Sequence, residues 1–129
     1  MDIAGRGAAE LKRMELIQSE KQVLSGFVIR SEKAYPMMKK YAAYLERKSQ
    51  NHILSYGLGD WFDYGPKQPG ESQLTPKGLT ATAIYYYDVS LLHKMAKVLG
   101  KENDAVDFDR CACDIKKAFN HTFFNDTTF

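Results

Sequence analysis

The sequence has 129 residues, the length of one domain or of a piece of one. Its 18 lysines and arginines against 16 acidic residues leave a net charge of +2, too balanced to suggest a nucleic acid or a membrane surface as a partner. The apolar fraction of 44% is ordinary for a globular protein, and no apolar run reaches the length of a membrane span. Residues 1–10 lack the apolar segment of a secretory signal, and the localisation stays open.

The apolar spacing predicts an all-α chain of four helices. The first should run over residues 8–24 and end at Ser25-Gly26. The second should begin after Ser31 as N-cap, with Pro36 in its first turn, where the missing N–H costs nothing. Its predicted buried face consists of Ala34, Met37, Met38, Tyr41 and Leu45.

The last two helices should form an antiparallel hairpin over residues 77–99 and 102–119, because Gly100 is a good helix stop and the link is short. In the former helix the predicted buried face is Ala81, Ile84, Tyr85, Asp88, Leu91, Leu92, Met95 and Val98. In the latter it is Ala105, Phe108, Ala112, Ile115 and Phe119.

A long connection over residues 51–76 separates the two halves and contains the segment YGLGDWFDYGP, residues 56–66. This composition suits neither a helix nor a strand, because glycine, proline and aspartate are unfavourable in both. Aromatic rings stack on apolar sugar faces, carboxylates accept hydrogen bonds from hydroxyls, and glycines let the backbone approach a ligand. A loop with these residues is typical of a carbohydrate site.

Several motifs in a fixed order point to a known family. They are YPMMKKY (35–41), GLGDW (57–61), QLTPKG (73–78), ATA (81–83) with YYYD (85–88), and the ending AFNHTFF (118–124). With these spacings the chain resembles, from about residue 32 to its end, the catalytic domain of bacterial α-L-rhamnosidases of glycoside hydrolase family 78. Residues 1–30 show no such resemblance, so the chain divides into an N-terminal helix of uncertain origin (1–30) and a partial six-hairpin glycosidase domain (31–129).

The resemblance implies an (α/α)6 barrel of six helical hairpins and hydrolysis of terminal α-L-rhamnosyl residues with inversion of configuration. Inversion requires a general acid and a general base about 6.5–9.5 Å apart. In the family both lie outside the part matched here, so we expect no catalytic residue in this chain. The implied partners are a rhamnose-containing oligosaccharide or glycoside and the missing parts of the barrel itself, and the isolated chain should be inactive.

The candidate substrate-binding residues are Asp60, Trp61 and Asp63. The resemblance makes Asp60 a cleft residue that accepts hydrogen bonds from sugar hydroxyls and Trp61 a wall of the pocket. The alternatives are a turn-forming aspartate and a core tryptophan. Asp63 is expected on the loop or at the rim, and the spacing leaves open whether Asp60 and Asp63 approach each other as an acid–base pair.

Other reactive side chains have structural explanations. Asp88 is expected to be held by a tyrosine hydroxyl, a loop N–H or a lysine. Cys111 and Cys113 point about 200° apart on a helix and should neither pair nor chelate. His52, His93 and His121 lack metal-ligand spacing, and no cluster argues for calcium, so we expect no metal and no cofactor.

Two other functions compete with the rhamnosidase fragment. One is a sugar-binding remnant without chemistry, and the other is a helical scaffold that binds a protein. A solenoid scaffold predicts a repeat of about 34–40 residues, and the helix pairs show no convincing self-similarity.

Overall fold

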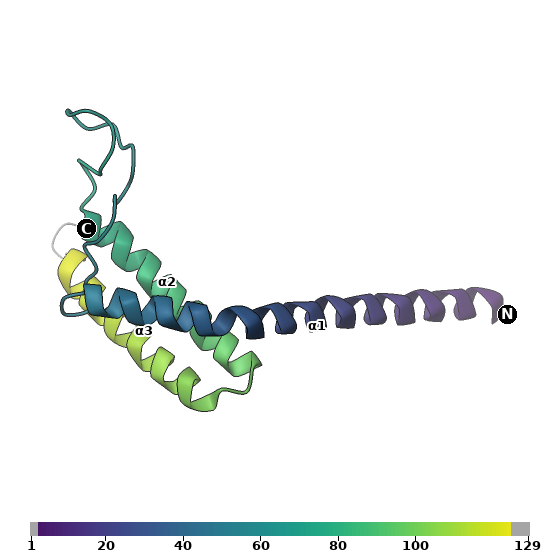
Figure 1. Cartoon of the computed structure of the whole chain (residues 1–129). Helices are drawn as coiled ribbons and strands as arrows, with labels where there is room; N and C mark the ends of the chain where they lie inside the picture. The colour runs from purple at the N-terminus through teal and green to yellow at the C-terminus, as the bar shows by residue number, and fades with distance from the viewer. Residues whose placement is uncertain (1–2, 125–129) are drawn as a thin grey trace. The chain divides into compact units, whose positions relative to one another are not determined.

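The computed structural model describes residues 3–124, with the backbone and only a few side chains before residue 28. Three helices make up most of this range: α1 (Ile3–Lys48), α2 (Lys77–Val98) and α3 (Glu102–Phe123) (Figure 1). The described residues contain no strand, only an isolated bridge between Gln50 and Ile53. The prediction of an all-helical chain is confirmed.

The two helices predicted before residue 50 are a single helix, so the prediction of a break between them was wrong. The Ser25 hydroxyl donates to the carbonyl of Gln22 at 2.9 Å, which satisfies it within the helix. Gly26 does not adopt the left-handed backbone of a helix end. Ser31 is therefore no N-cap, and Pro36 lies inside the helix, where it removes one backbone hydrogen bond.

The chain divides by its internal contacts into two compact units, Met1–Ala34 and Tyr35–Phe129. In the first unit, residues 3–34 form one continuous run of helix. The second unit contains the rest of α1, the long connection, α2 and α3. A separate origin for residues 1–30 stays a prediction.

Helices α2 and α3 form the predicted antiparallel hairpin (Figure 1). Gly100 has φ of +66°, the left-handed conformation that ends a helix, and the Lys101 N–H donates to the Ala96 carbonyl at 2.8 Å. Both predicted ranges are confirmed in outline. Helix α3 ends four residues later than expected, at Phe123 instead of residue 119.

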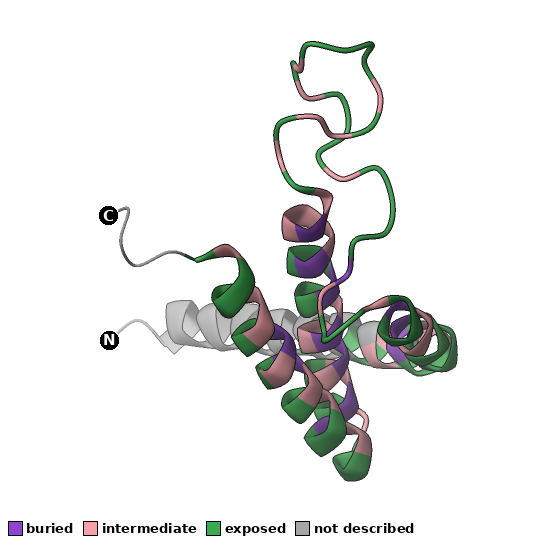
Figure 2. Cartoon of the chain, turned by 90° about the vertical axis from the view of Figure 1, so that its left-hand side faces the viewer, coloured by how far each residue is buried: buried purple, intermediate pink, exposed green. Residues whose placement is uncertain are grey.

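The core of the second unit lies between the C-terminal part of α1 and the α2–α3 hairpin. Buried side chains gather in two clusters along the hairpin. Figure 2 colours the buried positions purple on the ribbon. The first cluster is Leu45, Leu54, Tyr85, Val89, Ala112 and Ile115. The second is Tyr35, Ala42, Leu92, Ala96 and Ala105. A layer this small leaves many apolar side chains at the surface of the chain.

The buried faces of α1 and α2 are rotated from the predicted ones. In α1, Met37 and Tyr41 are exposed while Tyr35 and Ala42 are buried. In α2 the buried residues are Gly78, Thr82, Tyr85, Val89, Leu92 and Ala96. Tyr85 and Leu92 of the predicted face are buried as expected, whereas Ile84 is 60% exposed and Val98 is exposed too. The predicted face of α3 is largely correct, with Ala105, Ala112 and Ile115 buried.

A polar contact ties the long connection to α2 at the edge of the core. The buried Thr82 hydroxyl accepts the N–H of Leu54 at 2.9 Å and lies 3.3 Å from the Leu54 carbonyl, to which it can donate. Just before Leu54, Asn51 and His52 adopt φ of +50° and +64° in a tight turn of the chain. The chain that leaves α1 is therefore turned back and anchored before the exposed part of the loop begins.

Candidate functional site

The connection between α1 and α2, residues 49–76, forms a largely exposed loop at one end of the hairpin (Figures 1 and 2). Two backbone hydrogen bonds join its outgoing and returning halves. The Ser72 N–H donates to the Leu58 carbonyl at 2.8 Å, and the Phe62 N–H donates to the Gly70 carbonyl at 3.0 Å. The predicted aromatic and acidic segment therefore lies in a folded-back loop.

Two glycines allow the halves of the loop to touch. Gly59 has φ of +73°, and a Cβ there would lie 2.7 Å from the Cβ of Ser72. A Cβ on Gly65 would collide with the side chain of Gln73. Any larger residue at either position would force the returning half away.

The Asp63 carboxylate is the centre of the loop. It accepts backbone N–H groups from Leu74 at 2.7 Å, Gln73 at 2.9 Å and Thr75 at 3.3 Å, and the Ser72 hydroxyl at 3.4 Å. These donors, the Leu74 N–H most of all, hold the pKa of Asp63 below its usual range. A carboxyl group held deprotonated is a poor general acid, so Asp63 is unsuited to protonating a leaving group.

Asp60 lies on the same turn as Asp63 and is exposed. The Asp63 N–H donates to the Asp60 carbonyl at 3.3 Å, which closes the turn. The Thr75 hydroxyl donates to Asp60 Oδ2 at 3.2 Å. Within the described part of the chain this is the one hydrogen bond to the Asp60 side chain, so Oδ1 is available to a ligand.

Trp61 is 62% exposed and lies outside the core of the described residues. Its ring meets the ring of Phe62 edge-on, with centroids 5.4 Å apart and an angle of 76°. Phe62 adopts φ of +73°, and Tyr64 is 98% exposed. The loop thus carries exposed aromatic side chains and the exposed Asp60 on one segment.

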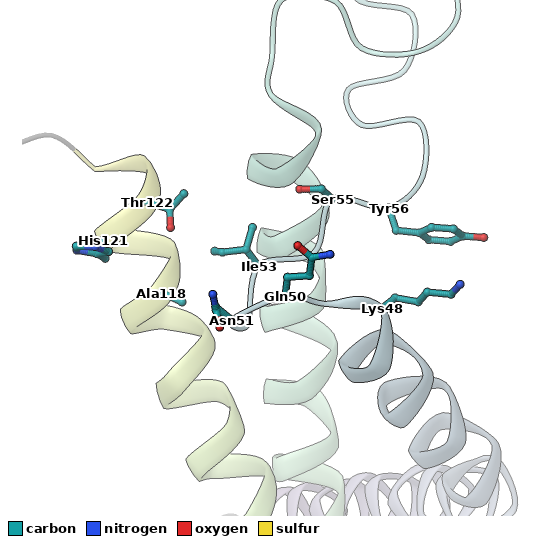
Figure 3. Close-up of a pocket in the computed structure, with 9 residues that line it drawn as sticks. All are labelled: Lys48, Gln50, Asn51, Ile53, Ser55, Tyr56, Ala118, His121 and Thr122. Carbon is teal, nitrogen blue, oxygen red and sulfur yellow. The ribbon is translucent and has the colours of Figure 1, made fainter.

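A hollow of about 710 Å³ lies at the base of the loop, between its first residues and the end of α3 (Figure 3). None of the three predicted site residues lines it. Its lining is Lys48, Gln50, Asn51, Ile53, Ser55, Tyr56, Ala118, His121 and Thr122. The Lys48 ammonium also lies 5.6 Å from the centroid of the Tyr56 ring, close enough for a cation–π contact. The hollow was not predicted, because the segments that form it are about 65 residues apart and carry no shared signal.

Other predicted residues lie away from the loop. Asp88 is half-buried, and burial raises its pKa; none of its three expected partners contacts it among the described residues. Cys111 and Cys113 are both free, and the Cys111 thiol lies 3.7 Å from the Tyr85 hydroxyl. His93 Nδ1 lies 2.8 Å from the Ala105 carbonyl.

The described residues contain neither a metal-binding cluster nor a membrane-spanning helix. In residues 3–124, no group of three or more histidine, cysteine, aspartate or glutamate side chains is arranged to hold a metal ion. Over the same range, no helix has both the length and the apolar character needed to cross a membrane.

Comparison with known proteins gives consistent relatives. Residues 29–129 match the model of the bacterial α-L-rhamnosidase six-hairpin glycosidase domain. An α-L-rhamnosidase of Alteromonas sp. (strain LOR) is 31% identical over 99 residues, which is 74% of this chain and 11% of that protein.

Two solved structures share the fold of the second unit. The α-L-rhamnosidase of Dictyoglumus thermophilum is 35% identical with a TM-score of 0.66, over 74% of this chain and 10% of its own. The Streptomyces avermitilis α-L-rhamnosidase in complex with L-rhamnose is 29% identical with a TM-score of 0.62, over 74% and 9%. The chain thus spans about a tenth of the length of these relatives. On the match of residues 29–129, the chain belongs to the bacterial α-L-rhamnosidase six-hairpin glycosidase family.

Proposed function

We propose that this chain is part of an inverting α-L-rhamnosidase, a hydrolase of terminal α-L-rhamnosyl residues, and that it supplies a substrate-binding loop of the cleft. The observation that carries the proposal is the loop geometry. An exposed tryptophan and a carboxylate with an available oxygen are held side by side on one turn of a chain that belongs to a rhamnosidase family. The substrate is a rhamnose-containing oligosaccharide or glycoside.

In this proposal Asp60 and Trp61 bind the sugar. Asp60 Oδ1 accepts hydrogen bonds from sugar hydroxyls, and the ring of Trp61 covers an apolar sugar face. Asp63 was the third predicted contact, but its carboxylate is already surrounded by donors from residues 72–75.

The chemistry itself is assigned to parts of the enzyme outside this chain. Inverting hydrolysis needs a proton donor and a base about 6.5–9.5 Å apart on opposite faces of the sugar. The loop has three carboxylates, Asp60, Asp63 and Glu71, and the pKa of Asp63 is lowered rather than raised. This supports a proposal in which Asp63 is not the general acid and the other parts of the barrel supply it.

A segment exchange tests this function. In the Dictyoglumus enzyme, the part matched by this chain is replaced with the corresponding residues of this chain, and hydrolysis of an aryl α-L-rhamnoside is measured. We expect an active hybrid in which Asp60→Asn lowers kcat/KM by about 10–100-fold, the value of a lost hydrogen bond to a charged group. Glu71→Gln is the matched control, since Glu71 is an exposed carboxylate of the same loop whose one ion-pair partner among the described residues is Lys77.

Two results contradict the proposal. The first is a folded, active hybrid in which Asp60→Asn and Trp61→Ala both behave like the Glu71→Gln control, which would favour a scaffold role. The second is hydrolysis of the aryl rhamnoside by the purified 129-residue chain, lost on Asp60→Ala, which would place the acid and base in this chain.

A further inference from the structure

The contacts around Asp63 and Asp60 form one connected path through Thr75. The Thr75 N–H donates to Asp63 Oδ2 at 3.3 Å, and the Thr75 hydroxyl donates to Asp60 Oδ2 at 3.2 Å. Thr75, in the returning half of the loop, is therefore hydrogen-bonded to Asp63 through its N–H and to Asp60 through its hydroxyl. Neither Thr75 nor this path was singled out by the sequence.

We propose that Asp63 and Thr75 are positioning residues, which fix the Asp60 carboxylate in the orientation that binds the sugar. The assignment rests on the proposed function, in which Asp60 is the sugar contact. The two aspartates of this turn then have different roles. Asp60 contacts the sugar, and Asp63 binds the returning half of the loop, which orients the Asp60 carboxylate.

The hydrogen-bond capacity of Asp63 supports this division. Oδ2 receives the N–H groups of Leu74 and Thr75, and the Gln73 N–H is shared between Oδ2 at 2.9 Å and Oδ1 at 3.0 Å. A carboxylate offers about four acceptor positions, so three backbone donors occupy most of them. The Asp60 carboxylate receives one protein donor, the Thr75 hydroxyl, among the described residues, and so has more room for a sugar hydroxyl.

Further hydrogen bonds within the loop hold residues 72–75 in place. The side chain of Gln73 accepts the Lys67 N–H at 2.6 Å and donates to the Gln68 carbonyl at 3.1 Å. The Ser72 hydroxyl has a single hydrogen, and the Thr75 carbonyl is the closer of its two acceptors, the other being Asp63 Oδ2 at 3.4 Å. Residues 72–75 are thus tied to the loop through both backbone and side chains, which makes Thr75 a rigid support for Asp60.

The test uses the 129-residue chain and two matched pairs of variants. Thr75→Val keeps the shape of threonine and removes the hydroxyl, whereas Thr75→Ser keeps the hydroxyl. Asp63→Asn removes the charge that gathers the backbone donors, whereas Glu71→Gln removes an exposed carboxylate elsewhere in the loop. The readouts are the χ1 distribution of Asp60 from three-bond NMR couplings, the fluorescence anisotropy of Trp61, the only tryptophan of the chain, and the affinity for L-rhamnose.

We expect one dominant χ1 rotamer of Asp60 in the wild type, Thr75→Ser and Glu71→Gln chains, and averaging among rotamers in Thr75→Val and Asp63→Asn. Anisotropy of Trp61 should fall only in Asp63→Asn, because Thr75→Val leaves the backbone donors in place. L-Rhamnose affinity should fall about tenfold in Thr75→Val, the effect of losing one hydrogen bond to a charged group, and recover in Thr75→Ser.

A single Asp60 rotamer in Thr75→Val, or an unchanged loop in Asp63→Asn, overturns the inference. Wild-type chain that does not bind L-rhamnose counts against the proposed function instead, and the rotamer and anisotropy measurements still decide whether Asp63 and Thr75 position Asp60. The two failures are therefore distinguishable.

Discussion

Replacing Ile115 with alanine should destabilise the second unit strongly. Ile115 is fully buried (0% exposed) in the cluster with Tyr85 and Val89. The change removes three carbon groups, which at about 0.8 kcal/mol each is about 2.4 kcal/mol of lost transfer free energy. The cavity left in a core of few side chains adds to this, so the free energy of unfolding should fall by about 3 kcal/mol. This is a large part of the about 5–15 kcal/mol that keeps a whole domain folded.

Urea unfolding followed by circular dichroism at 222 nm measures the effect, and Ile84→Ala is the matched control. Ile84 lies on α2, where the sequence placed it on the buried face and the structure leaves it 60% exposed. Its replacement should change the free energy of unfolding by less than about 0.5 kcal/mol. Equal destabilisation by the two variants would refute the observed buried face of α2. An unchanged urea midpoint in Ile115→Ala would refute the core that contains Ile115.

Three further outcomes are expected. Tyr35→Phe removes the hydroxyl that donates to Asp104 at 2.8 Å and should lower the urea-derived free energy of unfolding by about 1 kcal/mol; no loss would mean that this bond adds no net stability. The pKa of Asp63 is lowered on folding, so the loop order that it maintains should be fully present above its unfolded pKa and be lost as the pH falls through the lower folded value. Anisotropy of Trp61 between pH 5 and 2 measures this loss, and a flat profile would contradict it. Gly26→Ala should increase helix content and stabilise α1 by about 0.5–1 kcal/mol, because Gly26 is inside the helix and a Cβ there meets no atom within 4 Å; hydrogen exchange of the flanking amides would reveal a loss of protection if a helix end lay there instead.

The helical hairpin was predictable because its signals are local. Gly100 marks the turn, and the periodicity of residues 102–119 follows one helix face. The break predicted near Gly26 failed because serine, glycine and proline mark helix ends only on average. The Ser25 hydroxyl bonds within the helix, and Pro36 costs one hydrogen bond in a helix that continues on both sides.

The buried face of α2 was misread for a different reason. Tyr85 and Leu92 were placed correctly on the contact side, but Ile84 and Val98 were added to it and Thr82, Val89 and Ala96 were left out. A buried threonine becomes acceptable only when another segment satisfies its hydroxyl, and its partner, the backbone of Leu54, is 28 residues away. No window of sequence contains both groups.

The same limit applies to the loop. The sequence placed Asp60, Trp61 and Asp63 together on one exposed segment because aromatic, acidic and glycine residues are concentrated there. The resemblance placed Asp60 in the cleft and Asp63 on the loop or at the rim, but it could not show what surrounds Asp63, because the donors there are mainly backbone N–H groups of residues 73–75. Every residue type except proline carries such a group, so it leaves no mark in the sequence.

The contact between Leu54 and Thr82 has a consequence for how this family can vary. This contact joins Leu54, near the start of the connection, to Thr82 in α2. The alignment of the helices therefore does not depend on the residues between Leu54 and α2. For a flexible segment, the entropy cost of closure grows only by about 0.6 kcal/mol when its length doubles. Insertions, deletions and whole exchanges between these two residues should therefore cost the packing of the three helices little free energy, so the length and sequence of this segment can change without a change in the helices.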